Sequence, residues 1–183
     1  MTSNTSTRSP RSFIQLLAPP LFLLCSGYLF AVLWFDLMAD VSITGVTTAI
    51  IPEANLAPVA AYYRLMFGPM SWLVKAVMLT SIACALLQLT IQALPRSARI
   101  AAVLLNTAPV VLALNQVVPN ALRLAARTDS LEVQSQLARS IYAGHIASIL
   151  CIGALCLLEL YVLVRLQSRA RAGTSGHKLL LIS

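Results

Sequence analysis

Hydrophobic positions along the chain fall into four long segments that are separated by shorter polar stretches. A helix needs roughly 20 apolar residues to cross the hydrocarbon core of a bilayer, which is about 30 Å thick. The four segments meet that need and lie near residues 13–37, 67–94, 100–118 and 141–164. The pattern therefore predicts an all-α fold, a four-helix transmembrane bundle. The first segment exceeds the roughly 7–15 apolar residues of a signal peptide, so we interpret it as a retained span.

The composition indicates the same environment. Hydrophobic residues make up 58% of the chain and charged residues only 10%, and the mean hydropathy is +0.82. A soluble domain carries about 25% charged residues, which keep its surface hydrated. The composition excludes a soluble globular protein, and the low charge also excludes a disordered chain. The lipid bilayer is the first partner that the sequence predicts.

The net charge of +7 would suggest nucleic acid in a soluble protein, but no nucleic-acid motif is present and we expect no such partner. Sorted by side of the bundle, the side of the termini carries only basic residues: Arg8, Arg11, Arg96, Arg99, Arg165, Arg169, Arg171 and Lys178. The opposite side mixes arginines with acids. Because Lys and Arg concentrate in cytoplasmic loops, both termini are expected in the cytoplasm of a bacterium, with the spans in its inner membrane.

The chain divides into three predicted regions: a basic cytoplasmic tail at 1–12, a membrane domain at 13–168 and a basic mobile tail at 169–183. Residues 41–58 contain several glycine and proline positions, and they are predicted to form an irregular outer segment at the membrane interface. Asp129 and Glu132 resemble the capping box that starts a helix. The fourth helix is therefore expected to extend outside the bilayer.

Polar residues mark one level near the outer end of the bundle. Counting about 20 residues, or about 30 Å, from the inner end of each span reaches Asp36, Lys75 and His145, and in the third span it reaches Pro119, with Asn115 one turn deeper. Ionisable residues at membrane depth are a default hypothesis for function. An Asp36–Lys75 ion pair beside His145 would supply a base, its orienting partner and a positive charge. In the alternative, Lys75 and His145 extend to the interface separately and share no site.

Aromatic side chains surround the same level, among them Tyr63 and Tyr142. Such rings are typical of the aromatic belt at a membrane surface. They are also the side chains with which a cavity would hold an apolar ligand. Both interpretations stay open at this point.

A second polar group is predicted nearer the inner surface. Gln88 and Asn106 lie at similar distances from the turn at Pro95, so we expect a hydrogen bond between them worth about 1 kcal/mol. Glu159 is expected to pair with one of the inner arginines, Arg96, Arg99 or Arg165. These contacts would hold the helices together.

Neither a metal nor another cofactor is expected. All four cysteines fall within predicted spans, where a thiol behaves as a small hydrophobic group, and no C-x-x-C motif occurs. Haem ligation by two histidines would need a second histidine within the membrane, but His177 lies in the C-terminal tail.

Several short motifs occur in a characteristic order. Tyr63-Arg64 leads into the second span, Val118-Pro119-Asn120 ends the third, and His145 opens the fourth. In this order the chain resembles the anthrone oxygenase-like family of small four-helix membrane proteins, from about residue 20 to residue 165.

The resemblance implies oxidation of an electron-rich aromatic compound by dioxygen without metal or flavin. Removing a proton next to a ketone gives an enolate that reacts with dioxygen, so the protein supplies a base and stabilises the anion. The resemblance assigns the base to His145 and its orienting partner to Asp36. The enolate would be stabilised by Arg64, Asn120 or Lys75.

The alternative is a non-catalytic accessory subunit of a larger inner-membrane complex, or a homo-oligomer. Two pairs of small residues spaced four apart, Gly27 with Ala31 and Gly144 with Ser148, allow close helix contacts. Packing within the bundle itself accounts equally for these pairs.

Overall fold

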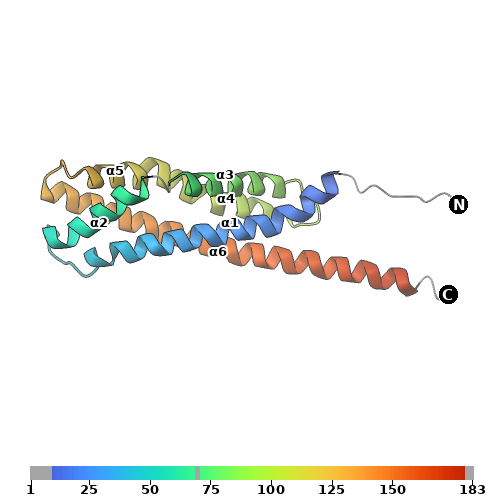
Figure 1. Cartoon of the computed structure of the whole chain (residues 1–183). Coiled ribbons are helices and arrows are strands. Elements are labelled where there is room, and N and C mark those ends of the chain that lie inside the picture. Colours follow the sequence, from blue (N-terminus) through green and yellow to red (C-terminus); the bar gives the residue numbers. More distant parts are fainter. Residues whose placement is uncertain (1–9, 69–70, 180–183) are drawn as a thin grey trace.

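A computed structural model of the chain describes residues 10–68 and 71–179, and these residues are almost entirely helical (Figure 1). The helices follow one another as α1 (Pro10–Asp40), a short 3-10 turn η1 (Val41–Ile43), α2 (Glu53–Met66), α3 (Ser71–Gln88), α4 (Arg96–Leu112), a π-helical turn η2 (Ala113–Val117), α5 (Val118–Ala126) and α6 (Leu131–Leu179). The predicted all-α class is confirmed.

Four helical stretches are long and apolar enough to cross a membrane: Leu17–Ile43, Ser71–Gln88, Arg96–Ala126 and Leu131–Arg169. They correspond in order to the four predicted spans, and the chain is an integral membrane protein by this criterion. Many large apolar side chains on the outside of these helices are exposed, among them Leu24, Leu79 and Leu150. Such side chains are suited to contact lipid.

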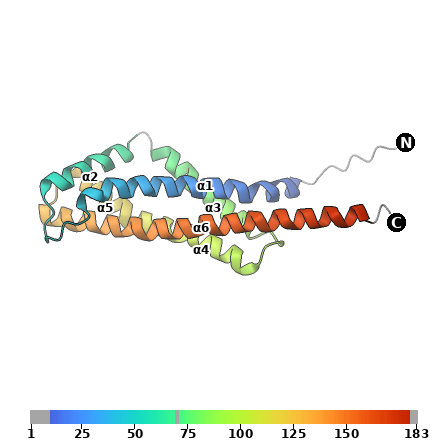
Figure 2. The same ribbon diagram turned by 90° about the horizontal axis from the view of Figure 1, so that it is seen from below.

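In the bundle, α1 and α6 pack along each other, and α3 and α4 complete the four helices. The start of α1 and the end of α6 lie at the same end of the molecule (Figures 1 and 2). Below, this end is called the inner end and the opposite end the outer end. The apolar core includes Phe22, Cys84, Ala102, Ile152 and Leu155.

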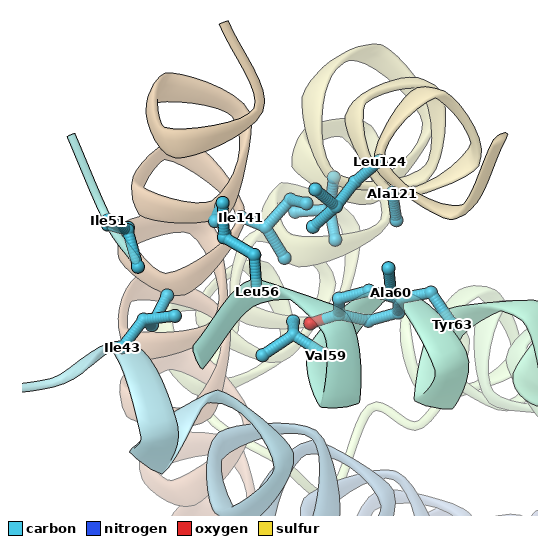
Figure 3. Close-up of a cluster of buried hydrophobic side chains, with 11 residues drawn as sticks. Ile43, Ile51, Leu56, Val59, Ala60, Tyr63, Ala121, Leu124 and Ile141 are labelled. Atoms are coloured by element: carbon cyan, nitrogen blue, oxygen red, sulfur yellow. The ribbon is translucent and has the colours of Figure 1, made fainter. Parts of the chain in front are cut away.

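A small helical unit, the headpiece, closes the outer end. It consists of α2, α5, residues 41–52 and the first turns of α6. Its own core contains Leu56 and Val59 of α2, Leu124 of α5 and Ile141 of α6 (Figure 3). Arg139 of α6 donates to the carbonyl oxygens of Thr48 and Ala49, and this holds the 41–52 segment against the bundle.

The second span begins later than predicted, because part of the preceding segment forms α2 of the headpiece. Residues 41–58 were predicted to be irregular, but α2 begins at Glu53 and the second span begins at Ser71 rather than near residue 67. Pro58 lies inside α2, where it removes one N–H···O bond of the helix. Pro58 is exposed, so water can satisfy the carbonyl group that loses its partner.

The third helical stretch is longer than predicted because Pro119 does not end it. A proline inside a helix lacks an N–H and crowds the preceding turn. The wider π-helical turn η2 directly precedes Pro119 and accommodates this crowding, so the helix continues to Ala126. Arg127 then ends it in a left-handed conformation, with a φ of 56°.

The fourth helix begins ten residues before the predicted span, at Leu131. Its first turn is capped by the hydroxyl of Ser130, which accepts from the Val133 N–H, rather than by Asp129. At the other end α6 continues to Leu179, through most of the region 169–183 that was predicted to be a mobile tail. The expected tail at 1–12 lies mostly outside the described residues, and α1 begins at Pro10.

Candidate functional site

Five polar side chains from three helices meet where the bundle joins the headpiece. Asp36 and Asp40 lie one helical turn apart at the outer end of α1, Tyr62 and Tyr63 are adjacent in α2, and His145 lies in α6. Spacing by four places the two carboxylates on one face of α1. We call these five residues the outer cluster.

The centre of the outer cluster is a pair formed by Asp40 and His145. The Nδ1 atom of His145 lies 2.8 Å from Oδ2 of Asp40. The other carboxylate oxygen of Asp40 accepts a hydrogen bond of 2.7 Å from the hydroxyl of Tyr63. The exposed fraction is 0% for Asp40 and 3% for His145. Both groups are therefore removed from solvent and fixed by direct contacts.

Asp36 occupies the more open edge of the cluster. It accepts a hydrogen bond of 2.6 Å from the hydroxyl of Tyr62. Its Oδ2 atom lies 3.9 Å from Nε2 of His145, which exceeds the roughly 3.2 Å limit of a direct hydrogen bond. The side chain of Asp36 keeps 13% of its surface exposed. Asp36 thus lies between the buried side chain of His145 and the exterior of the bundle.

The two tyrosines act as hydrogen-bond donors. Burial raises the pKa of both hydroxyls above its ordinary value, and the neighbouring carboxylates, Asp36 for Tyr62 and Asp40 for Tyr63, raise it further. Both hydroxyls therefore keep their protons at physiological pH. The hydroxyl of Tyr62 donates its proton to Asp36, and the hydroxyl of Tyr63 donates its proton to Asp40.

This arrangement determines how the histidine can react. When Asp40 accepts the Nδ1–H of a neutral imidazole, the lone pair of the ring lies on Nε2. Nε2 has no hydrogen-bond partner among the described residues, and its closest acid is Asp36. An imidazole that is oriented by a buried carboxylate and has a free second nitrogen is the arrangement of a general base.

The structure brings together three of the residues that the sequence singled out: Asp36, Tyr63 and His145. Lys75 does not join them. It is exposed on α3, and among the described side chains it forms no ion pair with Asp36. The predicted Asp36–Lys75 pair is thus corrected, because Asp36 bonds Tyr62 instead. The orienting partner of His145 is Asp40 rather than Asp36.

The other candidate residues make contacts elsewhere. Arg64 is exposed and donates to the carbonyl oxygen of Ala125, so it ties α2 to α5. Asn120 donates to the hydroxyl of Ser140 and connects α5 with α6. These are structural contacts of the headpiece.

Asn115 and Tyr142 also lie outside the outer cluster. Asn115 is exposed, bonds the carbonyl oxygen of Val111 in the preceding turn, and lines a shallow groove between α4 and α6. Tyr142 is partly buried against the core of the headpiece. No bond joins either residue to the cluster among the described side chains.

Sequence reasoning missed Asp40 as a site residue, and it placed Tyr62 at this level only as one of the surrounding aromatic side chains. The predicted first span ends near residue 37, so the sequence places Asp40 among the acids of the outer segment. The spacing of Asp36 and Asp40 was the available signal, since residues four apart share a helix face. Among the described residues, no group of three or more His, Cys, Asp or Glu side chains has a metal-binding arrangement.

The inner polar group also differs from its prediction. Gln88 of α3 donates to Glu159 of α6, and not to Asn106. Asn106 is fully buried, and neither atom of its amide has a partner among the described residues. Glu159 forms no ion pair with Arg96, Arg99 or Arg165.

Comparison of the chain with protein families, with curated proteins and with solved structures finds no match. The site is therefore interpreted from its own geometry.

Proposed function

We propose that this membrane protein binds a small hydrophobic aromatic compound at the outer end of its bundle, and that His145 removes an acidic proton from it. The observation that carries the proposal is the pair of His145 and Asp40, in which one ring nitrogen bonds a fully buried carboxylate and the other has no direct partner. Proton removal in a site shielded from water needs such an oriented base.

The edge of the cluster at Asp36 is the proposed entrance for the ligand. Asp36 and Tyr62 are the more accessible members of the outer cluster. Trp34 and Phe35 precede Asp36 on α1 and are 51% and 66% exposed. An aromatic compound dissolved in the outer leaflet would meet apolar rings there before it reached the polar groups.

The resemblance to anthrone oxygenases suggests the reaction. His145 Nε2 accepts a proton from a CH2 group next to a conjugated ketone, and the electron pair of the C–H bond stays on the substrate as an enolate. The enolate reduces dioxygen and forms a C–O bond, and the peroxide anion takes the proton back from His145. Loss of water from the resulting hydroperoxide leaves a new carbonyl group, so that CH2 and O2 give C=O and H2O. The hydroxyl groups of Tyr62 and Tyr63 lie near the base, but each already donates to a carboxylate.

His145→Gln is expected to abolish turnover while the protein stays folded. The side-chain amide of glutamine can still donate to Asp40 but has no basic nitrogen, and removing a general base lowers rates by about 10² to 10⁴-fold. The measurement is oxygen consumption with anthrone as the probe substrate, in detergent or nanodiscs. Gln136→Ala, an exposed position on α6, is the matched control. Wild-type protein that consumes no oxygen with anthrone, or a fully active His145→Gln variant, would contradict the oxygenase proposal.

We also propose that both termini face the cytoplasm of a bacterium. The start of α1 and the end of α6 share one end of the bundle (Figure 1), and the charge at that end is basic. Reporter enzymes fused to either terminus should therefore be active only if they function in the cytoplasm. A fusion after Ser183 that is active in the periplasm would reverse the orientation.

A second candidate function is that of an accessory subunit. Gly27 and Ala31 are both exposed on α1, and a Cβ atom added at Gly27 would meet nothing within 4 Å. This pair of small residues thus faces away from the bundle, where a helix of a partner or of a second copy could approach closely. A bulky side chain at Gly27 should therefore separate this function from catalysis.

A further inference from the structure

Gln88 of α3 and Glu159 of α6 form a second buried polar pair, toward the inner end of the bundle. Both side chains have an exposed fraction of 0%. The Nε2 atom of Gln88 donates to Oε2 of Glu159. About 21 Å of α6 separates Glu159 from His145, so the mechanism proposed above does not use this pair.

Glu159 lies in an apolar setting without a compensating charge. None of the described basic side chains forms an ion pair with it. The arginines of this end bind elsewhere: Arg99 to the carbonyl oxygen of Leu89, Arg169 to that of Ala93, and Arg165 to the ring of Tyr161. An ionised carboxylate held by a single amide would carry a large desolvation cost.

The hydrogen bonds that are missing from the pair indicate what completes it. Oε1 of Glu159 and Oε1 of Gln88 are both buried, and neither has a partner among the described residues. If Glu159 is ionised, both atoms are acceptors and cannot satisfy each other. A proton on Oε1 of Glu159 turns that atom into a donor for Oε1 of Gln88. The acid and the amide are then joined by two hydrogen bonds.

The other titratable groups near Glu159 are thiols. Cys84 of α3 and Cys156 of α6 lie close enough to interact with its charge, and Cys25 of α1 lies near Cys84. A thiol carries no positive charge, so it cannot neutralise the carboxylate of Glu159 as a bound proton does. We therefore propose that Gln88 and Glu159 form an intramembrane proton-binding site, in which one proton bridges their two Oε1 atoms.

Infrared difference spectroscopy of the full chain in lipid nanodiscs tests this site at neutral pH. The wild-type spectrum minus that of Glu159→Gln should contain the C=O stretching band of a protonated carboxylic acid, and the band should shift in D2O. Glutamine matches glutamate in size and can form an amide–amide pair with Gln88, so this variant should fold. Glu132→Gln, an exposed position at the start of α6, is the matched control and should leave the band unchanged.

Gln88→Met provides an independent second measurement. Methionine keeps the volume but removes both polar groups of the amide, the Nε2 donor to Oε2 of Glu159 and the Oε1 acceptor of the proposed second hydrogen bond, so the C=O band of Glu159 should change frequency without disappearing. Absence of the band from the wild type at neutral pH, its loss on addition of Na⁺, or an unchanged band in Gln88→Met would overturn the proposal. None of these outcomes depends on oxygenase activity, so this site and the proposed reaction at His145 can fail separately.

Discussion

Replacing Asp40 with alanine is expected to lower the free energy of unfolding by about 2–6 kcal/mol, because it leaves two buried donors, the Nδ1–H of His145 and the hydroxyl of Tyr63, without their acceptor at about 1–3 kcal/mol each. Asp40 is fully buried, and its two oxygens contact His145 and Tyr63. Unfolding in mixed micelles, followed by circular dichroism as the fraction of sodium dodecyl sulfate rises, gives this energy. His145→Ala should also destabilise, since it leaves the Asp40 carboxylate with Tyr63 alone.

The double variant shows whether the two side chains act as a unit. Asp40→Ala combined with His145→Ala should cost less than the sum of the single variants, with a coupling energy of about 0.5–3 kcal/mol. Asp36 and Lys75 form the control pair, because both are charged residues near the outer end but no ion pair joins them. Their effects should add. Additive losses for Asp40 and His145 would show that the bond between them contributes nothing to stability.

The residues of the outer cluster are predictable from the sequence only in part: their depth can be predicted, but the direction of their side chains cannot. Depth along a helix follows from counting residues, so Asp36 and His145 could be placed at one level. The direction in which a side chain points depends on how the helices are rotated, and the residue count does not contain that information. Lys75 was therefore assigned to the cluster although it lies on an exposed face of α3. Asp40 was omitted although it is the closest partner of His145.

The spans themselves were predictable because lipid imposes a simple rule. Every backbone polar group in the membrane must bond internally, so a long apolar segment becomes a helix. The headpiece follows no such rule. Its helix α2 contains Pro58 and gains its stability from contacts with distant segments, such as those of Leu56 with Leu124 and Ile141 in one core (Figure 3). Contacts of this kind cannot be derived from local sequence.

Glu159 illustrates the same limit in the interior. The inner-end position of Arg96, Arg99 and Arg165 predicts an ion pair of one of them with Glu159. The arginines instead bind backbone carbonyl oxygens at the helix ends, where their charge stays close to water. Glu159 points inward to Gln88, at an exposed fraction of 0%. The length of an arginine side chain allows this arrangement, and the rotation of α6 that turns Glu159 toward Gln88 is not contained in the local sequence.

Substitutions at Gly144 are expected to have the other large effect on stability. A Cβ atom at this position would lie 2.6 Å from Cγ2 of Val117, closer than carbon atoms can approach. Val117 is a β-branched residue and has little rotamer freedom in a helix, so it cannot simply turn aside. Gly144→Ala should therefore lower the free energy of unfolding by about 1–3 kcal/mol, and Gly144→Leu by more. Adding Val117→Ala to Gly144→Ala should restore part of the loss. An unchanged unfolding transition in Gly144→Ala would mean that α6 and the π-helical turn do not pack this closely.

Gly27→Leu is the matched substitution on the outside of the bundle, and it decides between the two candidate functions. A side chain added there meets no atom of the chain within 4 Å, so the unfolding energy should stay at its wild-type value. If the protein is an accessory subunit that packs a partner helix against Gly27 and Ala31, the leucine should reduce co-purification of that partner without unfolding the chain. If it is the oxygenase proposed above, Gly27→Leu should leave oxygen consumption intact, whereas His145→Gln abolishes it. Loss of a partner in Gly27→Leu, together with no effect of His145→Gln in either assay, would replace the catalytic proposal with the structural one.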